Sequence, residues 1–322
     1  MADLRVLLTR RWPAAAERAI ASRYDVHLNE LDRAMSAHDL ADALRNFDIV
    51  CPTVTDRIDR SLLDGGQIRA RALCNYGAGC SHIDVGAFTA SNVIVTNTPD
   101  VLTDDTADLT IMLALMCARR ASEGERLVRK GDWQGWAPTN LLGTRISGKT
   151  LGIVGFGRIG QAVARRARNG FGMNILYASR NPAPEQIEQE LEARHAAIDD
   201  LFAISDVVSL HLPGGPQTRH LVDARRLALM QRSAILINTA RGEIVDEQAL
   251  ADALRNGTIR AAGLDVYEGE PEIFPELYGL ENVVLLPHLG SATHESRVAM
   301  GMRVLANIDA IATGASAPDR IA

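Results

Sequence analysis

One short segment limits the possible folds more than any other part of this 322-residue chain. The apolar run Thr150–Val154 leads directly into the glycine-rich turn Gly155-Phe-Gly157-Arg-Ile-Gly160, and the residues after the turn place apolar and charged side chains on separate helical faces. A short apolar run predicts a buried strand, and the segment after it predicts an amphipathic helix. A strand, a glycine turn and a helix in this order begin a parallel sheet that is covered by helices.

Each glycine of this turn has its own physical role. Gly155 permits the tight turn, Gly157 lets the backbone approach a pyrophosphate, and Gly160 lets the helix pack close to the strand. The helix N-terminus offers N–H groups and partial positive charge to the phosphates. A turn without a ligand is the alternative, but the strand before it and the helix after it favour a dinucleotide. The residues expected to bind it are Gly155, Gly157, Arg158, Ile159 and Gly160.

Short apolar runs alternate with amphipathic segments along the whole chain, in two series. This alternation is typical of parallel sheets with helices on both faces. Five runs suit a smaller doubly wound domain, and six suit two mononucleotide-binding halves. The predicted fold class is therefore α/β, with two doubly wound parallel-sheet domains. The first series is Leu4–Thr9, Tyr24–Leu28, Asp48–Cys51, Ala70–Asn75 and Val93–Thr96; the second is Thr150–Val154, Asn174–Ala178, Asp206–Leu210, Ala234–Asn238, Ala261–Val266 and Val283–Leu286.

Two helical segments lie outside these series. One, from about Asp104 to Lys130, separates the series, and the other, from about Ser291 to Thr313, follows the last predicted strand. Because the second helix comes too late for the six-strand unit, we expect the chain to return there and complete the first domain. A chain that crosses twice between domains forms a cleft with two hinges, where a ligand can bind.

The composition excludes several classes of partner. The chain has 34 Lys and Arg against 40 Asp and Glu, a net charge of −6, whereas a nucleic-acid-binding protein needs a basic face. The four cysteines form no CxxC pair and no histidine has zinc-ligand spacing, so we expect reduced thiols and no metal. No signal-peptide pattern begins the chain, and Leu109–Ala118 is about half the length of a membrane span. We expect a cytoplasmic protein that binds neither nucleic acid nor membrane.

The residues after the second strand of the six-strand series indicate which dinucleotide binds. A carboxylate about 20 residues after the glycine turn would bind the ribose 2′-hydroxyl and repel a 2′-phosphate. This sequence has Ser179-Arg180-Asn181 there and no acid. Ser179 can donate a hydrogen bond, and Arg180 can pair with a phosphate dianion. We predict that NADP(H) is preferred, with NAD(H) as a possible cofactor; the alternative is that Arg180 is a solvated surface charge.

Three polar side chains follow the last three predicted strands: Arg241, Glu270 and His288. Ligands of open α/β sheets bind outside the carboxyl ends of the strands, so we expect all three at the edge that carries the glycine turn. A histidine can protonate a carbonyl oxygen as hydride reaches the carbon, and a nearby carboxylate favours the imidazolium. Arg241 can bind a carboxylate and polarise the adjacent carbonyl. Glu268 is an alternative to Glu270, and each charged residue alone could be solvated.

With these motifs the sequence resembles the D-isomer-specific 2-hydroxyacid dehydrogenases, and within them it is most similar to the glyoxylate/hydroxypyruvate reductases. The resemblance covers nearly the whole chain. Beyond the glycine turn, the stretches that carry it are Gly77-Ala-Gly79 with Ile83-Asp84, Val95 to Asp108, Asn238-Thr-Ala-Arg-Gly-Glu243, Ala262-Gly-Leu-Asp-Val266 with Glu270-Pro271, and Leu286-Pro-His-Leu-Gly-Ser291.

The resemblance implies that NADPH or NADH reduces a small 2-keto acid, such as glyoxylate or hydroxypyruvate, to the D-2-hydroxy acid. It implies a Rossmann dinucleotide-binding domain, residues 101–287, inserted in a flavodoxin-like substrate domain formed by residues 1–100 and 288–322. It also implies the catalytic roles of Arg241, Glu270 and His288, and it selects Glu270 over Glu268 because the family's glutamate directly precedes a proline.

Binding roles are also implied by the resemblance. The backbone amides of Ala78 and Gly79 would hold the substrate carboxylate together with Arg241, and Asp265 would hold the nicotinamide carboxamide. The full set of implied cofactor-binding residues is Thr106, Gly155, Gly157, Arg158, Ile159, Gly160, Ser179, Arg180, Thr239, Asp265, His288 and Gly290.

Two features bear on the substrate and on assembly. Trp133 and Trp136 lie in a region that crosses to the partner subunit in similar reductases, so we expect a homodimer in which Trp136 helps to cover the partner's substrate. The alternative is that both are dimer-core aromatics. Cys80 and Ser81 stand where many relatives carry Tyr and Asp, so this chain departs from the family at the substrate end.

Two other functions are compatible with the sequence. A nucleotide-sensing protein that resembles the corepressors of this fold is one, although the chain has the complete trio of polar residues and no peptide-binding extension. A dehydrogenase of the same fold for another small anion, formate or phosphite, is the other. The carboxylate loop and the positions of Arg241, Glu270 and His288 favour a 2-oxo acid.

Overall fold

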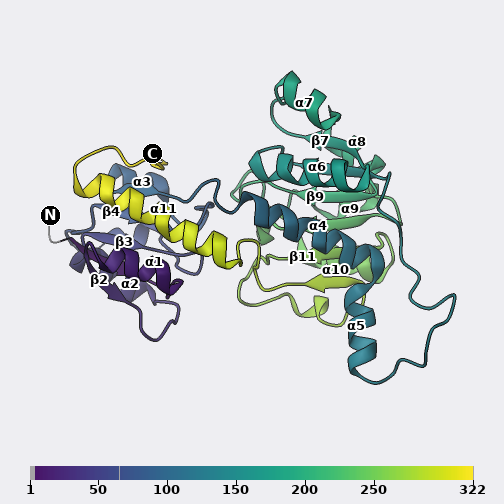
Figure 1. Ribbon diagram of the computed structural model, residues 1–322, viewed down its shortest axis with the longest axis horizontal. Helices are drawn as coiled ribbons and strands as arrows, with labels where there is room; N and C mark the ends of the chain where they lie inside the picture. The colour runs from purple at the N-terminus through teal and green to yellow at the C-terminus, as the bar shows by residue number, and fades with distance from the viewer. Residues whose placement is uncertain (1–3, 65, 322) are drawn as a thin grey trace. The chain divides into compact units, whose positions relative to one another are not determined.

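The computed structural model describes residues 4–64 and 66–321, which form two compact units (Figure 1). Unit 1 contains residues up to Leu102 and the returning segment from Ser291, and unit 2 contains Thr103–Gly290. The chain therefore passes twice between the units, once after residue 102 and once after residue 290.

Unit 1 is built on a five-stranded parallel sheet. Its strand order, β2-β1-β3-β4-β5, is that of flavodoxin-like folds, in which the order reverses between the first and third strands. The predicted first series is confirmed, with each strand one to three residues shorter than its apolar run. The strands are β1 (Arg5–Leu8), β2 (Asp25–Leu28), β3 (Ile49–Cys51), β4 (Ala72–Cys74) and β5 (Ile94–Thr96).

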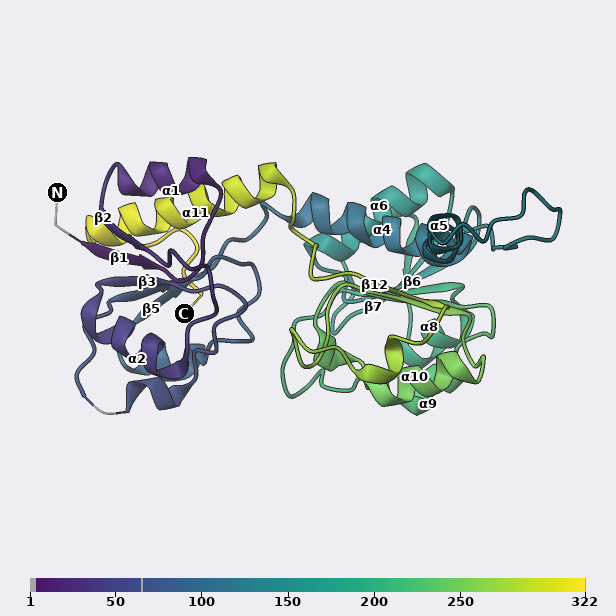
Figure 2. The ribbon, with the colours of Figure 1, turned by 90° about the horizontal axis from the view of Figure 1, so that it is seen from below.

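Helices cover both faces of this sheet (Figure 2). On one face, α1 (Ala14–Ala21) packs against α11 (His294–Ala312), so closely that a Cβ on Gly301 would lie 2.4 Å from the Cβ of Ala16. The other face carries α2 (Ala37–Asn46), the 3-10 helix η1 (Arg60–Leu63) and α3 (Val85–Ala90). The returning C-terminal helix therefore completes the core of unit 1, as the sequence predicts.

Unit 2 contains seven parallel strands, so the predicted number of six is wrong. Their order is β12-β11-β10-β9-β6-β7-β8, which is the Rossmann order with one further strand at the β12 edge. The strand that the sequence does not reveal is β8 (Ala193–His195). It has only three residues and buries only Ala193, so it lacks the apolar run that marks the others. The other six are β6 (Thr150–Val154), β7 (Asn174–Ala178), β9 (Val207–Leu210), β10 (Ile235–Asn238), β11 (Ala261–Leu264) and β12 (Val283–Leu285).

Helices also lie on both faces of the unit 2 sheet (Figure 2). The predicted helix from Asp104 to Lys130 is two helices, because the backbone of Arg120 adopts a left-handed conformation with a φ of +54°. On one face lie α4 (Thr103–Arg119) and α6 (Arg158–Phe171), with α5 (Ala121–Arg129) continuing from α4; on the other lie α8 (Ile198–Ile204), α9 (Ala224–Leu229) and α10 (Glu247–Arg255). The remaining helical segments are α7 (Glu185–Leu191), η2 (Gly242–Ile244) and η3 (Pro275–Leu277).

Candidate active site

The glycine-rich turn joins β6 to α6, and backbone packing requires two of its glycines. Gly155 has a φ of +94°, and a Cβ at this position would lie 2.4 Å from the carbonyl oxygen of His211. A Cβ on Gly160 would lie 2.4 Å from the carbonyl oxygen of Gly155. Both contacts are with main-chain atoms, which cannot move aside as a flexible side chain can. These two glycines therefore fix how closely α6 approaches the sheet.

Gly157 is different, because no neighbouring protein atom requires a glycine at this position. A Cβ there would meet nothing within 4 Å, and Gly157 is the N-cap of α6 without any side-chain cap. The amides of Arg158 and Ile159 precede the first hydrogen bond of the helix, which runs from the Gln161 N–H to the Gly157 carbonyl. A side chain at residue 157 would fill the cradle in front of these amides. The turn therefore fits the pyrophosphate of a dinucleotide.

The turn after β7 carries the residues that the sequence connects with the ribose. Ser179 is half-buried, and its hydroxyl donates to the carbonyl of Asn181 at 2.6 Å, while Arg180 is exposed. The missed strand β8 adds His195, whose Nε2 lies 3.1 Å from the carbonyl oxygen of Ser179. This histidine could not be found from the sequence, because its position depends on the pairing of β8 with β7.

The strands β10, β11 and β12 end side by side, and their register pairs Asn238 with Leu264 and Leu264 with Leu285. Arg241, Asp265 and His288 each follow one of these strand ends within three residues. Glu270 lies further along the loop after β11, and the Nδ1 of His288 lies 2.7 Å from its carboxylate. Both side chains are about 30% exposed. The acid and the imidazole that the sequence predicts together are thus in direct contact.

The surroundings of Glu270 favour its charged form. Burial would raise the pKa of this carboxyl, but the hydrogen bond and charge of His288, the Tyr267 backbone N–H and the charge of Arg241 together hold it below its ordinary value. The Tyr267 N–H donates to Glu270 at 3.0 Å. An ionised Glu270 bound to Nδ1 fixes the orientation of the imidazole and leaves Nε2 for another partner.

Glu268, the other candidate, binds elsewhere. Its carboxylate contacts Nε2 of His220 at 2.9 Å and forms an ion pair with Arg219. In addition, the backbone N–H of Glu268 donates to Glu247 at 3.0 Å. The geometry therefore pairs His288 with Glu270 and gives Glu268 a separate set of partners.

Asp265 is almost completely buried and holds the turn that carries His288. Its carboxylate accepts the backbone N–H groups of Leu289 at 2.6 Å and of Gly290 at 2.8 Å, and its carbonyl accepts the N–H of His288 at 2.9 Å. Burial raises the pKa of this carboxyl against the lowering effect of these N–H groups and of the His288 charge. His288 itself has a φ of +56°, a conformation uncommon for a residue other than glycine.

Helix α4 is connected to the same edge through threonines. The Thr106 hydroxyl donates to the carbonyl of Gly290 at 3.0 Å, and the hydroxyls of Thr110 and Thr239 are 2.9 Å apart. Thr106, Thr239 and Gly290 therefore lie together around the end of β10 and the turn after β12. Thr110 was not among the predicted residues, although it continues the same helical face.

Arg241 is positioned by two residues that the sequence does not single out for this role. The Asn238 side chain donates to the Arg241 carbonyl at 2.9 Å and accepts the Ala240 N–H at 3.1 Å. A Cβ on Gly242 would lie 1.8 Å from the carbonyl carbon of Tyr267, so the loop that carries Arg241 packs backbone to backbone on the loop that leads to Glu270. The need for glycine at residue 242 could not be predicted from the sequence, because it depends on packing between two separate loops.

The predicted carboxylate loop lies in the other unit. Ala78 and Gly79 follow β4 in unit 1 and are half-buried, whereas the other predicted site residues belong to unit 2. Two asparagines, Asn75 and Asn97, bind the carbonyl groups of this loop.

Comparison with known proteins identifies the family of this chain. Residues 111–290 match the family model of the D-isomer specific 2-hydroxyacid dehydrogenase, NAD binding domain. The chain is 44% identical over 321 residues to a glyoxylate reductase of Thermococcus litoralis, covering 98% of this chain and 96% of the relative. This chain belongs to the D-isomer specific 2-hydroxyacid dehydrogenase family. It is therefore an enzyme of the oxidoreductase class with a nicotinamide-binding domain.

Two solved structures of similar dehydrogenases extend the comparison. A glyoxylate reductase from Paecilomyes thermophila has a TM-score of 0.87 and 33% identity, covering 100% of this chain and 99% of that chain. An NADPH-dependent glyoxylate/hydroxypyruvate reductase from Sinorhizobium meliloti, in complex with NADP and malonate, has a TM-score of 0.88 and 32% identity, covering 100% and 97%.

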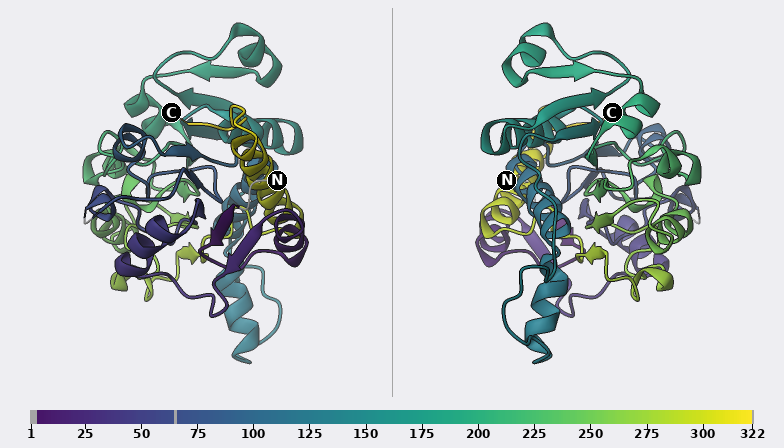
Figure 3. Two further views of the ribbon diagram at one scale, coloured as in Figure 1. Left: turned by 90° about the vertical axis from the view of Figure 1, so that its left-hand side faces the viewer. Right: turned by 90° about the vertical axis from the view of Figure 1, so that its right-hand side faces the viewer.

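The segment between α5 and β6 of this dehydrogenase carries the two tryptophans, and Figure 3 shows it extending with α5 away from the sheet of unit 2. Trp136 is 84% exposed in the single chain and Trp133 is 53% exposed. The nearby Val128 and Leu142 are exposed as well. Large apolar side chains on one projecting segment form a surface that suits contact with another chain.

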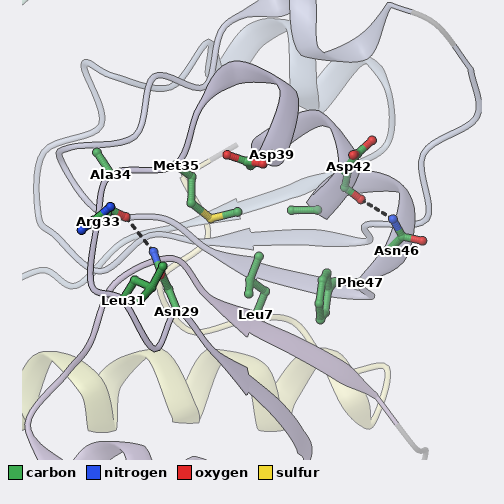
Figure 4. Close-up of a pocket in the computed structure, with 11 residues that line it drawn as sticks. Leu7, Asn29, Leu31, Arg33, Ala34, Met35, Asp39, Asp42, Asn46 and Phe47 are labelled. Carbon is green, nitrogen blue, oxygen red and sulfur yellow. Dashed lines mark hydrogen bonds between the residues drawn. The ribbon is translucent and has the colours of Figure 1, made fainter.

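A cavity of about 490 Å³ lies elsewhere in unit 1 (Figure 4). It is formed between α2 and the loop after β2, with Leu7, Leu31, Met35 and Phe47 among its apolar lining residues and Asp39 and Asp42 among its polar ones. None of the residues that line it is a predicted site residue. The site is instead assembled from loops at strand ends.

Within residues 4–64 and 66–321, no group of three or more His, Cys, Asp or Glu side chains is arranged to hold a metal ion. No helix in this part of the dehydrogenase is both long and apolar enough to span a bilayer.

Proposed function

We propose that the enzyme reduces glyoxylate, or hydroxypyruvate, to the corresponding D-2-hydroxy acid at the expense of NADPH or NADH. The observation that carries this proposal is the 2.7 Å contact between His288 and Glu270, with Arg241 close enough to lower the pKa of the same carboxyl. The names of the relatives in Thermococcus and Sinorhizobium support the choice of a small 2-oxo acid.

His288 supplies the proton of the reaction. When bound, the nicotinamide supplies a hydride to the substrate carbonyl carbon. The Nε2–H of the imidazolium donates to the carbonyl oxygen, while Nδ1 stays bound to Glu270, whose negative charge stabilises the imidazolium before the proton leaves. In this pair, Glu270 holds the imidazole ring of His288 in one orientation while the proton on Nε2 is transferred.

Arg241 and the carboxylate loop orient the substrate. The guanidinium of Arg241 binds the substrate carboxylate and polarises the adjacent carbonyl, and the backbone amides of Ala78 and Gly79 donate to the same carboxylate. Arg241 belongs to unit 2, and Ala78 and Gly79 belong to unit 1. Unit 1 acts as the substrate domain, and unit 2, Thr103–Gly290, acts as the cofactor domain.

The cofactor is held by the edge of the unit 2 sheet. Gly155, Gly157, Arg158, Ile159 and Gly160 hold the pyrophosphate. Asp265 orients the nicotinamide carboxamide through the lone pairs that its two backbone donors leave available. Ser179 and Arg180 give a preference for NADPH over NADH, since a cation and a hydroxyl suit a 2′-phosphate. The rest of the proposed cofactor-binding surface is formed by Thr106, Thr239, His288 and Gly290.

The enzyme acts as a homodimer in the cytoplasm. The exposure of Trp133 and Trp136 on the projecting segment supports an interface with a second copy, in which Trp136 helps to cover the partner's active site.

A substrate panel with both cofactors tests this function. Glyoxylate and hydroxypyruvate, each with NADPH and with NADH, are compared by kcat/KM. We expect reduction of at least one of them, with NADPH preferred. Formate or phosphite oxidation without reduction of any 2-oxo acid would contradict the substrate class, and equal or better use of NADH would contradict the cofactor preference.

A further inference from the structure

Two asparagines occupy equivalent positions at the carboxyl edge of the unit 1 sheet. Asn75 directly follows β4 and Asn97 directly follows β5, and the last residues of these strands, Cys74 and Thr96, are paired in register. Asn75 is completely buried. The two side chains therefore start next to each other from rigid strand ends.

These asparagines bind the carbonyl groups of three successive residues. Nδ2 of Asn75 donates to the carbonyl of Gly77 at 2.9 Å and to that of Gly79 at 3.1 Å. Nδ2 of Asn97 donates to the carbonyl of Ala78 at 2.7 Å. The loop thus has its carbonyl oxygens held mainly by these two side chains, and the backbone N–H of Thr98 adds a bond to the Gly77 carbonyl at 3.0 Å.

Fixing the carbonyls also fixes the amides. The peptide bonds of this loop are trans, and in a trans peptide the N–H of one residue points opposite to the carbonyl of the residue before it. The bond to the Gly77 carbonyl therefore directs the N–H of Ala78 away from Asn75, and the bond to the Ala78 carbonyl directs the N–H of Gly79 away from Asn97. Successive backbone N–H groups that are held in this way are suited to bind one anion together, as a nest.

The orientation of the Asn75 amide is itself determined. Its Oδ1 lies 3.0 Å from Nε2 of His82, which must be the donor of that bond. The reverse orientation of the amide would place Oδ1 against the carbonyl oxygens of Gly77 and Gly79. His82 is thus an indirect member of the network.

We propose that Asn75 and Asn97 are positioning residues that hold the amides of Ala78 and Gly79 in the orientation that binds the carboxylate of a 2-oxo acid. They act through the loop and touch no substrate atom. The proposal rests on the proposed function, which assigns the substrate carboxylate to these two amides.

The test replaces the donor of Asn97 by an acceptor of the same shape. In Asn97→Asp, a carboxylate oxygen faces the Ala78 carbonyl, so the peptide plane rotates and the nest is lost. We expect the KM for glyoxylate to rise roughly tenfold or more, and the Kd for NADPH, measured by its fluorescence, to change less than about twofold. Asn92→Asp is the matched control, because Asn92 is exposed in the same unit and its left-handed φ of +61° tolerates aspartate.

A binding measurement separates the two hypotheses. Oxalate, a dicarboxylate without a reducible carbonyl, is titrated calorimetrically into the wild-type, Asn97→Asp and Asn97→Ala proteins with NADP present. If the wild-type protein fails to reduce glyoxylate but binds oxalate more tightly than the variants do, the proposed function is wrong and the positioning role is supported.

If neither the KM for glyoxylate nor oxalate binding changes in Asn97→Asp, the positioning role is wrong. An equal loss of NADPH and oxalate binding would also overturn it, since that pattern indicates general damage. Thermal melting identifies a variant that does not fold. In that case Asn97→Ala, which removes the donor without adding charge, carries the test, with a smaller expected rise in KM.

Discussion

The two loops that we propose as anion-binding sites are built in different ways. The turn between β6 and α6 is shaped by backbone sterics: Gly155 and Gly160 must lack a Cβ because main-chain atoms lie 2.4 Å from where it would be. The loop after β4 has no helix and is shaped by asparagine side chains that bind its carbonyls. Both loops present backbone amides, but only the glycine turn has a residue pattern from which its structure can be predicted.

The largest effect is expected from a substitution that removes the proposed proton donor and leaves both loops intact. In His288→Ala, kcat should fall by about 10²–10⁴-fold, the range for loss of a general acid, because the imidazole is the group that we propose to protonate the carbonyl. The Kd for NADPH should change much less than kcat, since the glycine turn that we propose to hold the pyrophosphate persists.

Steady-state kinetics and NADPH fluorescence titration measure these two quantities. Loss of NADPH binding with only a small change in kcat would mean that His288 is structural.

The next largest effect should separate sterics from ligand binding in the glycine turn. In Gly157→Ala the added methyl group meets no protein atom, so the thermal midpoint should stay close to that of the wild type. The methyl group would instead enter the cradle at the N-terminus of α6, and we expect the Kd for NADPH to rise by about tenfold to 100-fold.

Gly170→Ala is the matched control, because Gly170 lies in the same helix and its Cβ also meets no atom within 4 Å. This control should bind NADPH normally. If Gly157→Ala bound NADPH as tightly as Gly170→Ala, the space beside Gly157 would not be a phosphate cradle.

The same contrast explains how much of the molecule could be predicted. A buried parallel strand must be apolar on both faces, so apolar runs mark ten of the strands in the two sheets. The strand β2 is also marked, although its alternation is weaker. The edge strand β8 buries only Ala193 and leaves no such mark. The sequence also does not predict the break at Arg120 between α4 and α5. Arginine rarely adopts a left-handed backbone conformation, so the residue type gives no indication of it.

The candidate site shows the same division. Arg241 and His288 could be found because each lies within three residues of a strand end and carries a side chain that can bind an anion or transfer a proton. Asn75, Asn97 and Asn238 could not be assigned their roles, because each acts by binding a backbone carbonyl whose position depends on the fold. The choice between Glu268 and Glu270 needed either the family resemblance or the hydrogen bond itself, since both lie in one loop.

The last expected effect, on kcat rather than on cofactor binding, concerns the choice between Glu268 and Glu270. Glu270→Gln should lower kcat by roughly tenfold to 100-fold, because the imidazolium of His288 loses its charged partner. Glu268→Gln is the matched control and should keep kcat within about threefold, since its partners are His220 and Arg219 rather than His288.

The pH dependence of stability gives a second measurement on the same pair. The pKa of Glu270 is lowered in the folded enzyme, so its ionised form contributes stability above the pKa of an unfolded-state glutamate, about 4.3, and this contribution is lost as the pH falls through the lower folded pKa. The free energy of unfolding of the wild type, compared with Glu270→Gln by urea denaturation, should therefore show an advantage at pH 6 that shrinks below about pH 4.3. An advantage that grew on acidification would mean that burial dominates and that Glu270 is protonated in the folded enzyme, which would remove the charged partner from His288.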